Sequence, residues 1–156
     1  MRDVERFEKA FLSLSAVLLV LFLGALAYAA VELGARLPSR EGEIDPTTVR
    51  STAPFDAPGV RQVGPGRYEV VVLGQIWSFA PGEIRVPAGA EVTFIATSAD
   101  VIHGFEVEGT RLNAMLLPGQ ITKLHYKFDK PGEHLVICHE YCGVGHHLMY
   151  GKVIVE

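Results

Sequence analysis

The chain has 156 residues, 49% of them hydrophobic, and its 14 lysines and arginines against 18 aspartates and glutamates give a net charge of -4. This length allows one domain and an appendage, and the absence of a basic stripe argues against nucleic acid as a partner. The cysteines, Cys138 and Cys142, number two, which is too few for a disulfide framework.

The first predicted element is an uncharged apolar run from Phe11 to Val31. At about 1.5 Å per residue, a helix of this length spans the hydrocarbon core of a bilayer. A cleaved signal peptide is the alternative, because Ala27-Tyr28-Ala29 resembles a cleavage site. The run is longer than a signal h-region, and the segment before it carries no net positive charge, so a membrane anchor over residues 1–36 is favoured.

Residues 37–67 are predicted to form an extended linker. They show no apolar periodicity, and prolines recur among glycines and charged residues, a composition typical of a semi-rigid connection. The prolines are Pro38, Pro46, Pro54, Pro58 and Pro65.

Residues 68–156 have the texture of an all-β domain, with short apolar runs separated by turn signals. The predicted strands are Tyr68–Leu73, Glu83–Val86, Glu91–Thr97, Ile102–Val107, Ile121–Phe128, His134–Ile137 and Lys152–Val155. Alternation in the third of these puts Val92, Phe94 and Ala96 on one face. Short strands at this spacing indicate an antiparallel sandwich or barrel.

The last two predicted strands are joined by the loop CHEYCGVGHHLM, which places Cys138, Cys142, His146 and Met149 at offsets 0, 4, 8 and 11. Thiolate, imidazole and thioether are soft ligands that select copper over hard cations. A copper–thiolate site also needs a ligand from elsewhere in the sheet, and His103 in DVIHGF is the candidate. Asp100 is the candidate to orient that imidazole, although a plain turn residue is the simpler interpretation.

Two other interpretations of the cysteines are a disulfide and a structural zinc site. Met149 and His103 favour copper, because zinc has no use for a thioether. A mononuclear blue-copper site uses one cysteine, so Cys138 and Cys142 together suit two coppers bridged by two thiolates. No nucleophile–base arrangement is present, so no catalytic residue is expected in this chain.

This pattern resembles a known signature. Cys138-His-Glu140-Tyr-Cys142-Gly143-(x2)-His146-(x2)-Met149, with Asp100-Val-Ile-His103 upstream, is similar to the copper-A motif in subunit II of haem–copper cytochrome c oxidases. Trp77-Ser-Phe79 is similar to an aromatic segment of that family. The single helix and Asp45-Pro-Thr-Thr-Val-Arg50 resemble the short, one-helix subunit II of ba3-type oxidases. The resemblance implies an all-β cupredoxin-like Greek-key barrel with one N-terminal transmembrane α-helix.

The resemblance also implies roles for individual residues. Cys138 and Cys142 would bridge both coppers, His103 and Met149 would bind one copper, and His146 and the main-chain carbonyl of Glu140 would bind the other. The Glu140 side chain matches a residue that binds Mg²⁺ in many members. Gln75 stands where the family often has a tryptophan at which electrons enter, so Trp77 is the candidate for that role here.

By the same resemblance, the chain would be the subunit of a terminal oxidase that accepts electrons from cytochrome c. It would pass them to a haem in subunit I, where O2 reduction is coupled to proton pumping, so the oxidoreductase chemistry would occur in another chain. The expected location is a prokaryotic plasma membrane, with the copper domain on the outer, periplasmic side. Two alternatives remain open: a copper-A subunit of a nitric oxide reductase, and a membrane-anchored copper chaperone.

Overall fold

The computed structural model describes residues 2–32 and 39–156, which divide into a helical unit and a β domain. Helix α1 (Arg2–Val31) is the predicted apolar helix. An 18-residue window within its Val4–Val31 stretch has a mean hydropathy of 2.5 and contains no buried residue, so by length and composition the helix is able to cross a membrane. Residues 33–36 of the predicted anchor lie outside the described residues.

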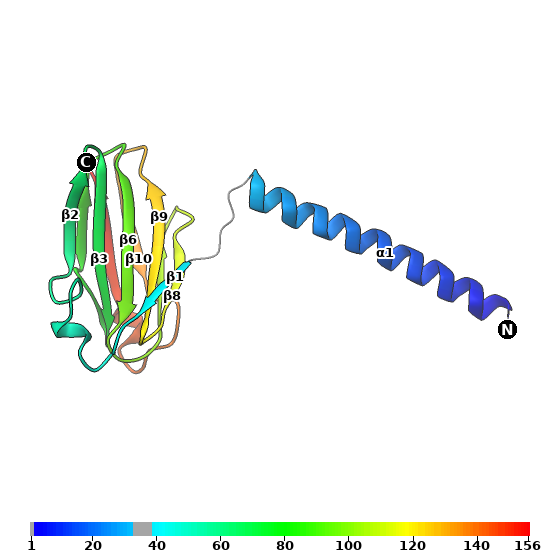
Figure 1. The fold of residues 1–156 in the computed structure, drawn as a ribbon, viewed down its shortest axis with the longest axis horizontal. Helices are drawn as coiled ribbons and strands as arrows, with labels where there is room; N and C mark the ends of the chain where they lie inside the picture. The colour runs from blue at the N-terminus through cyan, green and yellow to red at the C-terminus, as the bar shows by residue number, and fades with distance from the viewer. Residues whose placement is uncertain (1, 33–38) are drawn as a thin grey trace. The chain divides into compact units, whose positions relative to one another are not determined.

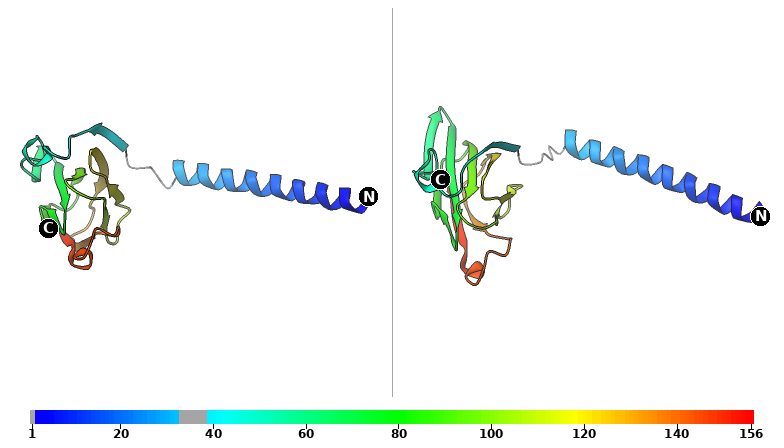
Figure 2. Two further views of the ribbon diagram at one scale, coloured as in Figure 1. Left: turned by 90° about the horizontal axis from the view of Figure 1, so that it is seen from below. Right: turned by 60° about the horizontal axis from the view of Figure 1, so that its bottom comes forward.

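The β domain is a sandwich of two sheets (Figures 1 and 2). One sheet has the order β1-β9-β6-β3-β2, with β4 paired to β3, and the other has the order β5-β11-β10-β7-β8. The strands are β1 (Ser39–Glu43), β2 (Gly59–Gly64), β3 (Arg67–Gln75), β4 (Ser78–Ala80), β5 (Glu83–Val86), β6 (Glu91–Ser98), β7 (His103–Val107), β8 (Asn113–Leu116), β9 (Gln120–Lys127), β10 (Gly132–Ile137) and β11 (Tyr150–Val155). Two short 3₁₀ helices, η1 (Val49–Ser51) and η2 (His146–Leu148), complete the domain.

The strands pair mainly in the antiparallel direction, as expected for a sandwich. Two pairs, β3 with β6 and β5 with β11, are parallel. Parallel neighbours cannot be joined by a hairpin, so between β3 and β6 the chain crosses to the other sheet and back. The predicted all-β sandwich is confirmed, and β4 and β8 are strands that the alternation pattern did not reveal.

The main core lies between the two sheets. It contains Val92, Phe94 and Ala96 from β6, which confirms the face predicted from their alternation. Strand β3 is buried on both of its faces, which explains why its central residues form an uninterrupted apolar run. Val71 and Leu73 of this run lie in a second cluster, outside the main core.

The prediction of a linker over residues 37–67 differs from the structure. Residues 37 and 38 lie outside the described part, but β1 pairs with β9 and β2 pairs with β3, so most of this segment belongs to the β domain. Val49 and Phe55 of this segment are buried in the second cluster, against Val71, Leu73 and Ile95. The proline-containing segment is therefore held to a sheet by strand pairing and does not form a free linker.

Candidate metal centre

The loop between β10 and β11 carries most of the predicted ligands. Its two ends meet where the Cys138 N–H donates to the Met149 carbonyl at 3.3 Å, immediately beyond the ladder that pairs the two strands. Within the loop, the His146 N–H donates to the Gly143 carbonyl at 3.1 Å, and η2 begins at His146. This hairpin anchoring brings Cys138 and Met149, which lie at opposite ends of the loop, together at one end of the sandwich.

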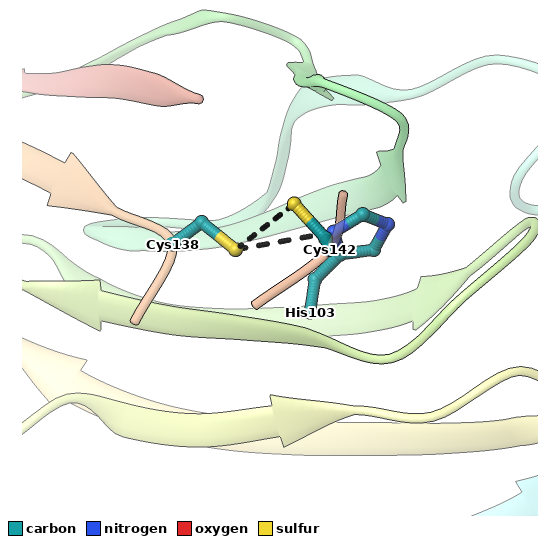
Figure 3. Close-up of side chains that lie close together, drawn as sticks. All are labelled: His103, Cys138 and Cys142. Carbon is teal, nitrogen blue, oxygen red and sulfur yellow. Dashed lines mark hydrogen bonds between the residues drawn. The ribbon is translucent and has the colours of Figure 1, made fainter. Parts of the chain in front are cut away.

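The two cysteines are buried and face each other (Figure 3). Their sulfur atoms are 3.9 Å apart, and both are free thiols. A disulfide has its sulfurs about 2.05 Å apart. Two sulfurs that are each about 2.3 Å from one metal, at a tetrahedral angle, lie about 3.8 Å apart. The spacing therefore matches two thiolates that share a metal and does not match a disulfide.

His103 approaches this pair from β7, the neighbour of β10 in the same sheet, as the first residue of that strand (Figure 3). The side chain is fully buried, and its Nδ1 lies 3.9 Å from the Cys138 sulfur. Its Nε2 lies 2.9 Å from Oδ1 of Asp100. A proton on Nε2 donates to this carboxylate and leaves Nδ1 free as a metal donor, which is how ligating histidines are commonly oriented. The donor atoms of His103, Cys138 and Cys142 all lie within 4.8 Å of one another.

Three further donors surround the cysteines. The Glu140 carbonyl lies 3.3 Å from the Cys138 sulfur. On the Cys142 sulfur, His146 Nδ1 approaches to 3.5 Å and the Met149 sulfur to 3.6 Å. The structure thus brings all six predicted metal positions together, through the side chains of five and the carbonyl of Glu140. The Glu140 side chain itself is exposed.

Asp100 is held by several donors at the turn between β6 and β7. Its Oδ2 accepts from the Ile76 N–H at 2.8 Å, and its Oδ1 accepts from the Val101 N–H at 2.8 Å as well as from His103. Burial alone would raise the pKa of this carboxyl, but the hydrogen bonds from Ile76, His103 and Val101 outweigh burial, and the pKa is lowered. Asp100 is therefore a fixed anionic acceptor for the imidazole.

Trp77 packs over the loop and is partly exposed. Its Nε1–H donates to the Cys142 carbonyl at 3.1 Å. Gly143 has a φ of +114°, and a Cβ there would lie 3.2 Å from Trp77 Nε1. A Cβ at Gly145 would overlap the indole ring. Glycine is thus required at both positions for the ring to reach the loop. Trp77 therefore packs against the loop, and its ring connects the protein surface to the backbone of Cys142.

The histidines that neighbour the predicted ligands in sequence have other surroundings. His139 and His147 are exposed, and His139 packs over Gly104, where a Cβ would lie 2.6 Å from His139 Cγ. The Tyr141 ring packs edge-on against the ring of His146, with centroids 5.8 Å apart. The choice of His146 over His147 thus agrees with the geometry.

Sequence reasoning missed one group near the site. Arg50, in η1, donates through Nη1 to Oε1 of Gln75, and its Nη2 lies 3.9 Å from Oδ2 of Asp100. No local pattern pointed to this contact, because it joins residues 25 and 50 positions apart in the sequence.

The Cys142 thiol of the metal-free protein holds its proton at neutral pH. Burial, and next the neighbouring Cys138, raise the pKa of Cys142 to about 11. Metal binding must displace this proton, because the thiolate is the ligand. Copper affinity is therefore expected to rise by at least about tenfold per pH unit across the neutral range. Isothermal titration at pH 6, 7 and 8 in buffers of different ionisation enthalpy measures both the affinity and the protons released. A pH-independent affinity would contradict this assignment.

The comparisons with known proteins agree with the geometry. The sequence model of the cytochrome c oxidase subunit II periplasmic domain matches residues 79–156. A cytochrome c oxidase subunit 2 from Thermus thermophilus is 43% identical over 154 residues, covering 96% of this chain and 92% of the relative. An alternative cytochrome c oxidase subunit 2 from Bradyrhizobium diazoefficiens is 31% identical over 121 residues, covering 78% of this chain and 42% of that protein.

Solved structures give the same answer for the fold. A chain in the cryo-EM structure of a heme-copper terminal oxidase dimer superposes with a TM-score of 0.79 and 38% identity, covering 96% of this chain and 99% of that one. The periplasmic domain of cytochrome oxidase subunit II from Bradyrhizobium japonicum superposes with a TM-score of 0.53 and 22% identity, covering 56% of this chain and 83% of that one, and supports the fold alone. The predicted cupredoxin-like fold with one N-terminal apolar helix is confirmed.

A family match over residues 79–156, together with a 43% identical relative that aligns along almost the whole chain, shows that this protein belongs to the cytochrome c oxidase subunit II family.

Proposed function

We propose that this chain is the electron-accepting subunit of a haem–copper terminal oxidase and holds a binuclear copper-A centre. The observation that carries the proposal is the pair of buried thiols 3.9 Å apart, with an imidazole nitrogen and a further donor beside each side of the pair. Bound copper supplies one-electron redox chemistry at this position.

Four donors lie beside the two sulfurs, enough to complete two metals that share both thiolates. Each sulfur has two further donors: the Cys138 sulfur lies beside His103 and the Glu140 carbonyl, and the Cys142 sulfur lies beside His146 and Met149. The ligand division comes from the family resemblance and not from these nearest contacts: His103 and Met149 would hold one copper, His146 and the Glu140 carbonyl would hold the other, and both thiolates would be shared. A structural zinc fits less well, because a closed zinc site takes four ligands and gains nothing from a thioether.

Rigid, dry surroundings suit electron transfer. His103, Cys138, Cys142 and Met149 are all buried, so water is kept from the sulfurs. The ligands are fixed by β7, by the ends of β10 and β11, and by the Asp100 carboxylate, so little movement accompanies a change of charge. The O2 chemistry would occur in a haem-containing partner subunit.

Cytochrome c is the proposed donor, and it would meet the exposed end of the sandwich. Trp77 is 43% exposed and donates to the Cys142 carbonyl, which gives a short route from the surface to the centre. The loop between β10 and β11 offers a largely uncharged contact surface beside Trp77. Its exposed apolar side chains are Tyr141, Val144 and Leu148. Trp77 is therefore the proposed point at which electrons enter.

The remaining proposals concern the assembly. Helix α1 would anchor the subunit in a prokaryotic plasma membrane beside subunit I, with the β domain on the periplasmic side. The exposed Glu140 carboxylate would be free to bind Mg²⁺ together with groups of another subunit. The Thermus relative and the oxidase dimer structure favour this assembly over a nitric oxide reductase subunit or a copper chaperone.

Affinity purification of the tagged, membrane-bound chain from its native host tests the proposal. We expect a haem-containing subunit to co-purify, and the complex to consume O2 when given reduced cytochrome c. Reduction of nitric oxide without O2 consumption would support the reductase alternative. Purification as a single chain that releases Cu(I) to an acceptor protein would support the chaperone alternative.

A further inference from the structure

We propose that Arg50 is a positioning residue for the metal centre: it holds Asp100, and through Asp100 it sets the orientation of His103 and the reduction potential of the bound copper. The part that concerns the potential rests on the proposed copper function, whereas the part that concerns His103 does not. The structural basis is a chain of contacts from η1 to the buried imidazole.

The backbone of η1 is fixed to the domain. Val49 is fully buried and lies in the second cluster with Phe55, Val71, Leu73 and Ile95. Just before it, the Ile44 N–H donates to the Gly119 carbonyl at 3.1 Å, so this segment is bound to the domain on both sides of η1. Because Val49 is fully buried in this cluster, the backbone at the next residue, Arg50, is held in a fixed position.

The guanidinium of Arg50 joins two segments at the metal end of the sandwich. Nη1 donates to Oε1 of Gln75, the last residue of β3, and Nη2 lies 3.9 Å from Oδ2 of Asp100. Gln75 Nε2 in turn donates to the Ser78 hydroxyl at 3.4 Å. A planar guanidinium fork can serve both acceptors at once, which an ammonium group does less well.

Asp100 passes this constraint to the ligand. The Ile76 N–H and Arg50 occupy the Oδ2 side of the carboxylate, which leaves Oδ1 directed at Nε2 of His103, 2.9 Å away. The Asp100 side chain is 20% exposed and that of Arg50 is 57% exposed. An ion pair so open to solvent adds little to folding stability. The ion pair instead fixes the position of the Asp100 carboxylate and offsets part of its negative charge beside His103.

The direction of the change in reduction potential follows from charge. Without the guanidinium, the negative charge of Asp100 beside His103 is no longer offset, and a more negative environment favours the more positive, oxidised centre. The reduction potential of an Arg50→Met variant should therefore fall. A less firmly held carboxylate should also let the ring of His103 populate its other tautomer, with the proton on Nδ1.

The test uses the full-length chain in detergent, with Arg50→Met and two comparison variants. Arg61→Met is the matched control, because Arg61 lies in the adjoining β2 and donates to the carbonyls of Pro54 and Ala57, away from the ligands. Arg50→Lys restores the charge without the fork. Copper content, reduction potential and ¹⁵N NMR of the histidine rings in the metal-free chain are measured for each.

We expect Arg50→Met to shift the reduction equilibrium about tenfold toward the oxidised form, which is about 59 mV for one electron. Arg61→Met should match the wild type, and Arg50→Lys should recover part of the shift. Equal potentials for Arg50→Met and Arg61→Met would overturn the redox part of the inference.

The NMR measurement separates this inference from the proposed function. In the metal-free wild type and in Arg61→Met, His103 should carry its proton on Nε2, and in Arg50→Met a second tautomer should appear. If the wild type failed to bind copper, the proposed function would fail while this measurement still tested the positioning role. An unchanged His103 ring in Arg50→Met would overturn that role.

Discussion

Replacing Cys142 with serine is expected to abolish the proposed two-copper centre. The Cys142 sulfur lies within 4 Å of Cys138, His146 and Met149, so it is the atom around which three other donors gather. A serine hydroxyl is a poor, hard ligand for copper and cannot bridge as a thiolate does. Copper bound by the full-length variant should fall from two to at most one per chain, and transfer of electrons from cytochrome c should stop.

A change in the same loop provides the control. His147 is exposed and adjoins His146, so His147→Ala should keep both coppers, whereas His146→Ala should lose at least one. Two tightly bound coppers in Cys142→Ser would contradict the bridging role. An equal loss of copper in His147→Ala and His146→Ala would contradict the choice of ligand.

Replacing Phe105 with alanine is expected to cost about 3–5 kcal/mol of unfolding free energy. Phe105 is fully buried between the sheets, with ring centroids 5.6 Å from Phe79 and 5.8 Å from Phe94. Removing the ring leaves a cavity between the sheets, and it also removes an edge-on contact with Phe79 and a tilted contact with Phe94. Urea unfolding of the metal-free chain, followed by the fluorescence of its single tryptophan, measures the loss.

Val63→Ala is the comparison for that experiment. Val63, in β2, is 58% exposed, so its truncation should change the unfolding free energy by no more than about 0.5 kcal/mol. If Phe105→Ala unfolded at the same urea concentration as Val63→Ala, the inter-sheet core would not be packed as described.

Much of the fold was predictable because its signals are local. The alternation of Val92, Phe94 and Ala96 identifies a strand with one face in the core, and the apolar run at Phe11–Val31 identifies a helix. The metal loop is also local, because its cysteines, His146 and Met149 lie within twelve consecutive residues. His103 lies 35 positions before Cys138, so it could be proposed only from the need for a ligand elsewhere in the sheet and from its DVIHGF context.

The segment before β3 was not predictable in the same way. Strand β2 pairs at the edge of a sheet and has mostly exposed side chains, so it lacks the alternation that marks a half-buried strand. Val49 and Phe55 are buried only because the outer face of β3 and β6 is apolar, with Val71 and Ile95 there to receive them. Arg50 depends on this docking in turn, which is why its contact with Asp100 emerged only from the structure.

The central claim is that the thiols of Cys138 and Cys142 are shared by two coppers, and one experiment tests it most directly. The full-length chain is loaded with copper in detergent, the copper-to-protein ratio is determined, and the EPR spectrum of the oxidised form is recorded. Two coppers per chain, with hyperfine structure from one electron shared by two equivalent copper nuclei, is the result predicted by the 3.9 Å sulfur pair. One copper with a mononuclear spectrum would contradict it.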